Sequence, residues 1–287
     1  KDEVFKMINN TKSLPISKAC LALGASKSGY YKWKNREPIT TDDKAIKKEI
    51  EGITLEFPCY GYRRVTKELH RRGVEINHKK TLKIMKEENI LCRRKKAFRP
   101  VTTNSNHNHN ICPNFIKNLE VTGLNQIWVA DITYIGLPNE FIYLAAIIDI
   151  FSRKCIGWEL GKEINNSLTL NALYMAISKR KCLGLCNLIH HSDRGAQYAS
   201  DAYVELLKKY GIRISMSAPG NPYENAYAES FNKTLKVEEV YVNEYETFEE
   251  ALKNIKHFIN IVYNKKRLHS SIGYVPPEEF EMEAIKQ

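Results

Sequence analysis

Residues 126–160 read QIWVADITYIGLPNEFIYLAAIIDIFSRKCIGWEL, and the architecture of the chain is worked out from this stretch. It contains three apolar runs rich in β-branched and aromatic residues. Only the short turns LPN and FSR separate these runs. Because strands need such residues and tight turns join neighbouring strands, the pattern predicts three antiparallel strands in a meander.

The pattern after residue 160 alternates between helix and strand. Helices are expected over 167–180, 195–210, 221–238 and 248–263, and short strands over 186–191 (CNLIHH) and 212–217 (IRISMS). The strand 186–191 is expected to run parallel to the first strand. Three antiparallel strands followed by alternating helix and strand predict an α/β fold, with a ribonuclease-H-like mixed five-stranded sheet flanked by helices.

An all-α helix-turn-helix region is predicted to precede this sheet. Residues 1–36 form a helix-turn-helix-like segment, with helices over 16–23 and from Ser26 to Lys34 around Gly24. Residues 37–92 form a second helical unit with helices over 42–55, 63–70 and 78–89, the last capped by Asn77. A structural three-helix bundle is the alternative for this unit. Residues 93–120 are a basic, polar linker, and residues 121–287 form the domain that contains the sheet, with a C-terminal helix and tail.

The positive charge of the chain is concentrated in the second helical unit. The net charge is +11, and Tyr62–Arg99 alone holds 14 Lys and Arg against 4 Asp and Glu, so 14 − 4 = +10. Such a block predicts a nucleic-acid partner, and a solvated basic surface is the alternative. The candidate phosphate contacts are Arg63, Arg64, Lys79, Lys80, Lys83, Arg93 and Arg94.

Membrane and secreted classes do not fit the sequence. No run approaches the roughly 20 apolar residues of a membrane span, and the charged start KDEVFKMINN lacks a signal peptide's apolar region. Seven loosely spaced cysteines fit a reducing cytoplasm. A zinc site at Cys182, Cys186, His190 and His191 is a disfavoured alternative, because the spacing is unlike that of common zinc motifs.

The helix over 221–238, NPYENAYAESFNKTLKVE, carries a polar stripe. Asn221 and Pro222 suit its first turn. Asn225, Glu229, Asn232, Lys233 and Lys236 share one face at helical spacing, while Phe231 and Leu235 point elsewhere. A solvated face is the usual reading of such a stripe.

Two aspartates upstream change this reading. Asp131 lies inside the first strand among apolar residues, where a carboxylate is costly unless it is paired or bound to metal. Asp193 directly follows the strand ending in LIHH, where sites form in open α/β sheets. With Glu229 they predict an oxygen-rich pocket for Mg²⁺ or Mn²⁺, with two ions suited to phosphoryl transfer.

The motifs WVADITYI, HSDRGAQY and NAYAESFNKTLKVE, with 61 residues between the two aspartates and 35 between Asp193 and Glu229, carry a specific resemblance. They resemble the catalytic core of DDE transposases and retroviral integrases. Within that group the chain resembles the second-frame transposases of the insertion-sequence-3 family. SKSGYYKW, YGYRRVTKEL, PNFIKN, DIFSRKCIGW and YNKKRLHSSIGYVPPEEF extend this resemblance over nearly the whole chain.

The resemblance implies roles for individual residues. Asp131, Asp193 and Glu229 would hold the metals, Lys236 would contact DNA near the cleaved phosphate, and Asn225 would lie near the site. Glu224 departs from the usual Asp at its position but keeps the charge. Asp149 matches the family, although an aspartate closing a turn is the simpler interpretation. His191 and Ser192 would lie behind Asp193, and Asn232 and Lys233 are interpreted as ordinary surface residues.

The resemblance also implies an activity and partners. The expected enzyme cuts DNA at the ends of a mobile element, frees a 3′-OH and transfers it to another strand. Its partners would be DNA, further copies of itself and an upstream-frame protein or fusion segment, with no membrane. It would act in the bacterial cytoplasm, at the nucleoid. A ribonuclease-H-like nuclease that only hydrolyses, or a non-catalytic DNA-binding regulator, are the alternatives.

Overall fold

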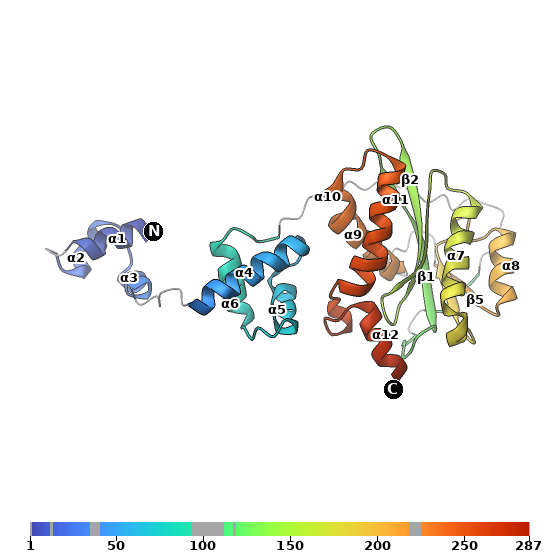
Figure 1. Cartoon of the computed structure of the whole chain (residues 1–287), viewed down its shortest axis with the longest axis horizontal. Helices are drawn as coiled ribbons and strands as arrows, with labels where there is room; N and C mark the ends of the chain where they lie inside the picture. Colours follow the sequence, from blue (N-terminus) through green and yellow to red (C-terminus); the bar gives the residue numbers. More distant parts are fainter. Residues whose placement is uncertain are drawn as a thin grey trace. The chain divides into compact units, whose positions relative to one another are not determined.

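A computed structural model describes residues 2–11, 14–34, 41–92, 112–116, 119–217 and 225–286. It divides into two compact units, Lys1–Gly52 and Ile53–Gln287, whose boundary falls inside helix α4 (Thr41–Glu56). Figure 1 shows the elements of both units along the chain. Within the described residues, no helix is long and apolar enough to cross a membrane.

Residues 2–34 contain three short helices, the last two of which match the two helices that the sequence predicts. They are α1 (Asp2–Asn10), α2 (Ile16–Ala22) and α3 (Lys27–Lys34). Ile8, Cys20 and Tyr30 are buried together between them. The Ser26 hydroxyl accepts a hydrogen bond from the backbone N–H of residue 29 at 2.9 Å, which is the cap expected at the start of α3.

Helices α4, α5 (Tyr62–Arg71) and α6 (His78–Glu87) match the three helices predicted for the basic segment. The Asn77 side chain accepts a hydrogen bond from Lys79 N at 2.8 Å, so the predicted cap of α6 is confirmed. Between α5 and α6 the chain turns at Gly73, whose φ of +81° is a conformation that favours glycine.

Helix α5 belongs to the same compact unit as the sheet. The Tyr60 hydroxyl, just before α5, accepts a hydrogen bond from Leu268 N at 2.8 Å. Arg71 pairs with Glu279 through two hydrogen bonds of 2.9 and 2.7 Å. One face of α5 is therefore packed against the C-terminal part of the chain. The predicted linker between them falls mostly on residues 93–111, which lie outside the described residues.

The five-stranded mixed sheet is confirmed. Its strand order is β3-β2-β1-β4-β5, with β1, β2 and β3 antiparallel and β4 and β5 parallel to β1. The strands are β1 (Ile127–Gly136), β2 (Phe141–Asp149), β3 (Cys155–Gly161), β4 (Ile189–Ser192) and β5 (Arg213–Met216).

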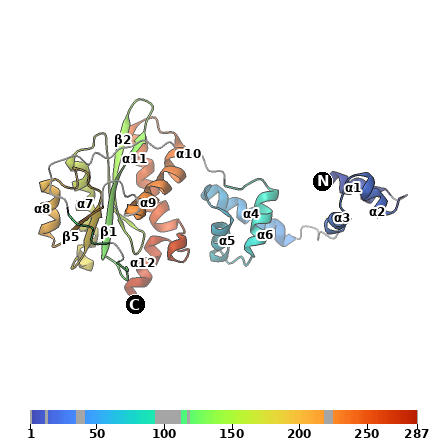
Figure 2. The same ribbon diagram turned by 180° about the vertical axis from the view of Figure 1, so that it is seen from behind.

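Helices cover both faces of this sheet, so it forms the middle of three layers (Figures 1 and 2). Helices α7 (Asn166–Arg180) and α8 (Asp201–Lys209) pack on one face, and α9 (Ala226–Leu235) and α11 (Phe248–His257) pack on the other. A Cβ on Gly157 of β3 would lie 2.2 Å from the Ala172 carbonyl oxygen, so glycine permits this close contact of β3 with α7.

Three predicted helices have different bounds in the structure. The helix expected over 195–210 begins only at Asp201. The helix expected over 221–238 is α9 followed by a π-helical turn, η3 (Lys236–Val240), and α10 (Tyr241–Asn243); residues 221–224 lie outside the described residues. Helix α11 continues as π-helical η4 (Phe258–Lys266). Leu235 and Val240 are both buried at a spacing of five residues, which a π-helical turn accommodates.

The C-terminal helix α12 (Pro277–Lys286) is fixed by one buried carboxylate. Glu281 forms an ion pair with Arg180, accepts a hydrogen bond from Ser152 Oγ at 2.6 Å, and lies 3.0 Å from Lys154 Nζ.

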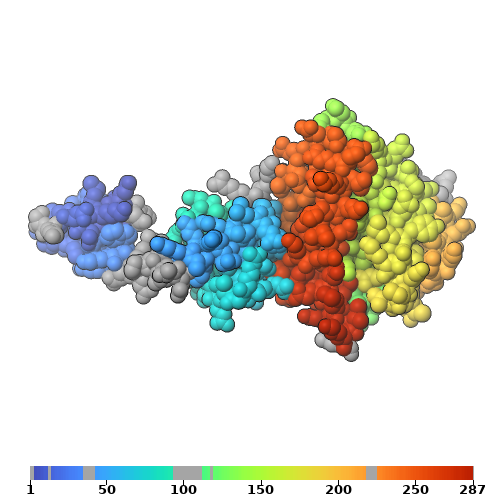
Figure 3. Space-filling model, viewed as in Figure 1, coloured from blue at the N-terminus to red at the C-terminus, as the bar shows by residue number. Residues whose placement is uncertain are grey.

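Short 3₁₀ turns occur at Lys181–Leu183 and Ser270–Ile272. In the space-filling view, the orange to red surface of the helices after α8 lies beside the yellow surface of α7, and the green β1–β2 turn projects above them (Figure 3).

Candidate active site

Strand pairing brings two predicted carboxylates to the same level. Strand β1 pairs in parallel with β4, with Val129 opposite His191. Two residues further along each chain are Asp131 and Asp193. Residues at the same level of neighbouring parallel strands project to the same side, about 4.8 Å apart between strands. Both side chains are half-buried.

Helix α9 crosses this position and is attached to β1 at two points. Asn225 donates a hydrogen bond from Nδ2 to the Ala130 carbonyl oxygen at 3.1 Å. Asn232 donates from Nδ2 to Oδ2 of Asp131 at 2.8 Å. Glu229 lies between these two asparagines along α9, and its side chain is exposed. The three predicted carboxylates thus come from three neighbouring elements, and Asp193 and Glu229 both act electrostatically on Asp131.

The electrostatics of Asp131 reflect this grouping. Burial, together with the negative charges of Asp193 and Glu229, raises the pKa of Asp131 to about 7. Hydrogen bonds from the Ile132 backbone and from Asn232 oppose the rise in this pKa. The other two carboxylates therefore destabilise the charged form of Asp131.

The prediction for Asn232 was wrong. Its side chain is buried rather than on the surface, and it contacts a predicted catalytic residue. It lies three residues after Glu229, on the helix face where Asn225 was recognised, so the helical spacing contained the signal. Lys233, one residue further, is exposed, as expected of a surface residue.

Two further residues of the HSDRGAQY motif were missed as parts of the site. The backbone N–H of Gly195 donates to Oδ1 of Asp193 at 2.9 Å, and a Cβ at this position would lie 3.0 Å from that same oxygen. Tyr198 is buried, and burial, together with Tyr203, Asp131 and Asp193, raises its pKa well above the ordinary value. Its hydroxyl has no hydrogen-bond partner in the described structure. Gly195 and Tyr198 therefore shape the surroundings of Asp193.

Lys236 lies at the far end of α9, in the π-helical turn. Its Nζ is 3.7 Å from the centre of the Tyr134 ring, and burial lowers its pKa while the charge of Asp131 acts in the opposite direction. The ammonium group is thus held over the ring of Tyr134, which lies in β1 three residues after Asp131. The stripe of predicted residues keeps Lys236 on the side of α9 that faces the carboxylates.

Asp149 stabilises the turn after β2. Its carboxylate accepts hydrogen bonds from the backbone N–H groups of Asn125, Phe151 and Ser152, and it is fully buried. The simpler interpretation, an aspartate closing a turn, therefore describes its contacts.

The residues around Asp193 that were candidates for other roles are also accounted for. His191 is buried and shares a hydrogen bond with Ser215 Oγ at 2.9 Å, and Ser192 donates to the backbone carbonyl of Asp193. His190 is buried against Tyr203, whereas Cys182 and Cys186 are exposed. The four candidates for the disfavoured zinc site thus divide between the core and the surface.

The predicted DNA contacts divide into three groups. Arg64 is not free for a phosphate, because it lies 3.7 Å from Glu238, which also pairs with Arg267 at 2.7 Å. Arg93 and Arg94 lie outside the described residues. The remaining predicted contacts have exposed side chains: Arg63, Lys79, Lys80 and Lys83.

The donor set at the carboxylates suits a hard divalent cation. Mutually repelling carboxylates lie beside two amide oxygens, Oδ1 of Asn225 and Oδ1 of Asn232, which are buried without a hydrogen-bond partner in the described part of the chain. Among the described residues, no group of three His, Cys, Asp or Glu side chains is close enough together to hold one metal ion. The donor types and the mutual repulsion of the carboxylates suit such an ion, whereas the spacing of the carboxylates does not close around one.

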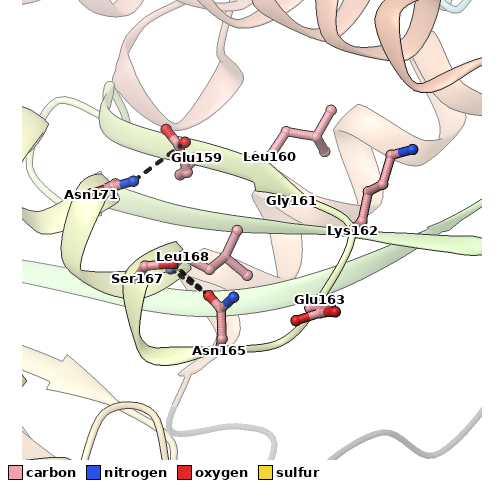
Figure 4. A pocket seen from close by; sticks show the side chains of 9 residues that line it. All are labelled: Glu159, Leu160, Gly161, Lys162, Glu163, Asn165, Ser167, Leu168 and Asn171. Atoms are coloured by element: carbon pink, nitrogen blue, oxygen red, sulfur yellow. Dashed lines mark hydrogen bonds between the residues drawn. The ribbon is translucent and has the colours of Figure 1, made fainter.

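A hollow of about 220 Å³ lies where β3 meets α7, and none of the predicted site residues lines it. In it Asn165 caps α7 by accepting a hydrogen bond from Leu168 N, and Asn171 reaches Glu159 at 3.5 Å (Figure 4). Its lining is polar and local: Glu159, Leu160, Gly161, Lys162, Glu163, Asn165, Ser167, Leu168 and Asn171.

Comparison with protein families gives matches over most of the chain. Two models described as integrase core domain match residues 122–222 and 210–277. A model described as an HTH-like domain matches residues 41–98. These ranges contain the carboxylate site and the basic helical unit, respectively.

Several curated proteins are similar over nearly their whole length. A 31 kDa protein of insertion element IS600 from Shigella sonnei is 38% identical, covering 91% of this chain and 96% of that protein. Transposase InsF of insertion sequence IS3A from Escherichia coli is 32% identical, covering 93% of both chains. A transposase of element IS904 from Lactococcus lactis is 35% identical, covering 86% of this chain and 94% of that protein.

Solved structures give more distant matches. A simian T-cell lymphotropic virus intasome in complex with a PP2A regulatory subunit matches with a TM-score of 0.46 and 18% identity, covering 81% of this chain and 74% of that chain. The HTLV-2 integrase catalytic core in complex with magnesium matches with a TM-score of 0.39 and 18% identity, covering 55% of this chain and 97% of that chain.

Proposed function

This chain belongs to the IS3 family of transposases, DDE-type polynucleotidyl transferases that carry out DNA transposition, and we propose that Asp131, Asp193 and Glu229 are its catalytic carboxylates. The observation that carries the assignment is the parallel register of β1 and β4, which brings Asp131 level with Asp193. The attachment of α9 to Ala130 and Asp131 supports including Glu229.

The three carboxylates would hold Mg²⁺ or Mn²⁺, as two ions. When bound, such ions activate the attacking oxygen and stabilise the leaving oxygen at a phosphodiester. Asn232 keeps the Asp131 carboxylate oriented through its hydrogen bond, and Gly195 N does the same for Asp193. Asn225 fixes the start of α9 to β1, so that the exposed Glu229 is presented at the same edge.

The reaction consists of two in-line displacements at phosphorus. In the first, a water oxygen forms a bond to phosphorus at the end of the element. The bond from phosphorus to the 3′ oxygen breaks, and that oxygen takes up a proton to become a free 3′-OH. In the second, this 3′-OH loses its proton, bonds to the phosphorus of another phosphodiester, and displaces the 3′ oxygen there. Lys236 contacts the DNA near the cleaved phosphate, where its ammonium charge offsets the charge of the phosphate oxygens.

The basic helical unit holds the DNA. Lys79, Lys80 and Lys83 lie exposed at the start of α6, where they contact phosphates and position the helix. Two DNA ends must meet for transfer, so the active form is a multimer of this chain on DNA, with an upstream-frame protein or fusion segment as a further partner. Its place of action is the bacterial cytoplasm, on the nucleoid.

The assignment is tested by nicking of an end-sequence oligonucleotide in Mg²⁺ or Mn²⁺. Asp193→Asn and Glu229→Gln should each abolish nicking, while Lys233→Ala should not. Unchanged nicking by either carboxylate variant would remove that residue from the proposed set. Pre-cut ends incubated with target DNA should give joined product. Hydrolysis without joining would favour a nuclease, and binding without cleavage in either metal would favour a regulator.

A further inference from the structure

A strained turn holds Arg153, a half-buried residue outside the three motifs that carry the carboxylates. Arg153 has φ +66°, a left-handed conformation that residues other than glycine adopt at a cost. Its N–H donates to the Asp149 carbonyl oxygen at 2.8 Å, and its own carbonyl oxygen accepts from the Tyr263 hydroxyl at 3.0 Å. The buried Asp149 carboxylate holds the rest of this turn. The surrounding contacts therefore maintain the unusual conformation.

The Arg153 side chain retains an unused donor. Its guanidinium carbon lies 4.1 Å from the centre of the Tyr227 ring, so the charged group is stacked on an aromatic face. Its Nε is buried and has no hydrogen-bond partner. Among the described residues, no carboxylate forms an ion pair with it. Because a buried donor is normally satisfied, this N–H is available to an acceptor that a bound group would supply.

A hollow of about 690 Å³ lies beside this pair. Its lining includes the rings of Phe151, Tyr227 and Phe280, and Phe151 and Phe280 pack together with centroids 5.2 Å apart. Glu120 also lines it and is exposed. The hollow therefore combines one positive guanidinium, three aromatic residues and enough volume for a group larger than a water molecule, and the rest of its lining is mostly aliphatic.

Guanidinium and aromatic rings together are the chemistry that binds unpaired nucleotides, because every base offers a face for stacking and every nucleotide carries a phosphate. Tyr227 is two residues before Glu229 on α9. We propose that the hollow beside Arg153 binds one unpaired nucleotide of the DNA substrate, with its phosphate against Arg153 and its base against the aromatic rings. The proposal rests on the proposed function in taking DNA as the ligand, but it does not depend on the catalytic carboxylates.

Binding is tested with a fluorescent 12-nucleotide oligothymidine at moderate salt. Arg153→Asn removes the guanidinium with a residue that tolerates the left-handed conformation. It should weaken binding about tenfold, as should Tyr227→Leu, since stacking contacts contribute on that order. Tyr227→Phe should bind like the wild type. Arg213→Gln is the matched control, because Arg213 stacks on Phe115 at 4.9 Å elsewhere in the core. Circular dichroism should confirm that each variant is folded.

Photo-cross-linking locates the ligand. An oligonucleotide containing 5-iodouracil should cross-link to a peptide that includes Tyr227 or Phe151, and Arg153→Asn should remove this cross-link. Cross-links confined to α4–α6, or altered self-association without altered DNA binding, would each overturn the proposal. Glu229→Gln should keep the cross-link. Loss of nicking with this cross-link intact would concern the carboxylates alone, and loss of the cross-link with nicking intact would concern the hollow alone.

Discussion

Asn232 donates a hydrogen bond to Oδ2 of Asp131 at 2.8 Å, across 101 positions of the chain. The amide opposes the rise in the pKa of Asp131 that burial and the neighbouring carboxylates cause. It therefore favours the charged form of the carboxylate, which is the form that binds a cation. Asn232 is thus a positioning residue for Asp131 rather than a ligand of the substrate.

Replacing Asn232 by Ala should reduce metal-dependent nicking about 10- to 100-fold, the usual effect of removing a partner of a metal ligand. The pH at which activity appears should also move upward, because the pKa of Asp131 loses an interaction that lowers it. A pH–rate profile of nicking measures this shift. Asn171→Ala, an exposed asparagine in α7, is the control. A lower rate with an unmoved profile would mean that Asn232 acts only on packing.

Removal of the Asp131 charge should stabilise the metal-free protein at neutral pH. Its pKa is raised from 3.8 to about 7, so the folded chain holds this proton to higher pH than the unfolded chain. The free energy of unfolding should therefore fall as pH rises between these values. Asp131→Asn should remove that decline and raise Tm by a few degrees at pH 7.5, measured without divalent ions.

The same variant tests metal binding. At about 100 times its Kd, a bound ion stabilises the fold by about 2.7 kcal/mol, equivalent to roughly 5–10 °C in Tm for a chain of this size. Mg²⁺ should raise the Tm of the wild type and of Asp201→Asn, an exposed aspartate in α8, but not of Asp131→Asn. An equal rise in all three proteins would show that the ion binds elsewhere.

Stability should fall in acid because of a buried histidine. Burial lowers the pKa of His190 to about 3, and its Nε2 shares a hydrogen bond with the Tyr203 hydroxyl at 2.9 Å. The unfolded chain takes up a proton near pH 6.5 whereas the folded chain resists it, so stability is present above pH 6.5 and is lost as pH falls towards 3. His190 contributes up to about 1.4 kcal/mol per pH unit in this window.

Urea unfolding at pH 7, 6 and 5 measures that slope. His190→Asn should flatten it, whatever its effect on stability at pH 7, while His257→Asn, on the surface of α11, should leave it unchanged. A slope that His190→Asn does not alter would assign the acid sensitivity to another group. His269, whose pKa burial and Arg267 lower to about 2, is the next candidate.

Local pattern was sufficient to predict the sheet, and it also supplied the carboxylate set that we propose. Strand β1 was recognisable because β-branched and aromatic residues surround Asp131, and the parallel pairing with β4 followed from the helix between them. Asn232 was misassigned because helical spacing places it on the polar stripe but does not show which part of that stripe is covered. Only the tertiary contact of α9 with β1 determines this.

The basic helical unit shows a second limit of prediction from sequence. Arg63 and Arg64 are adjacent, so sequence offers no basis for separating them. In the structure Arg63 is exposed, whereas Arg64 lies 3.7 Å from Glu238, 174 positions later. An ion pair between residues so far apart depends on the docking of α5 against the core. The same holds for Glu281, whose buried pairing with Arg180 no local pattern indicates.

Lys236 should matter more for catalysis than Lys233, although both lie on the polar stripe. The Lys236 ammonium is half-buried and held 3.7 Å from the centre of the Tyr134 ring, whereas Lys233 is exposed one turn earlier. A charge with a fixed position costs less to align with a reacting phosphate than one on a mobile side chain. Lys236→Ala should lower kcat/KM for nicking at least about tenfold, and Lys233→Ala less than about threefold.

Salt dependence separates positioning from general attraction. If Lys236→Ala or Lys233→Ala removes one phosphate contact, that substitution should reduce the slope of log affinity against log salt by about one unit. Only Lys236→Ala should in addition lower the single-turnover rate with saturating enzyme, where binding no longer limits. Equal single-turnover rates for the two variants would make Lys236 one of many phosphate contacts, and the ring of Tyr134 would then serve only to pack its side chain.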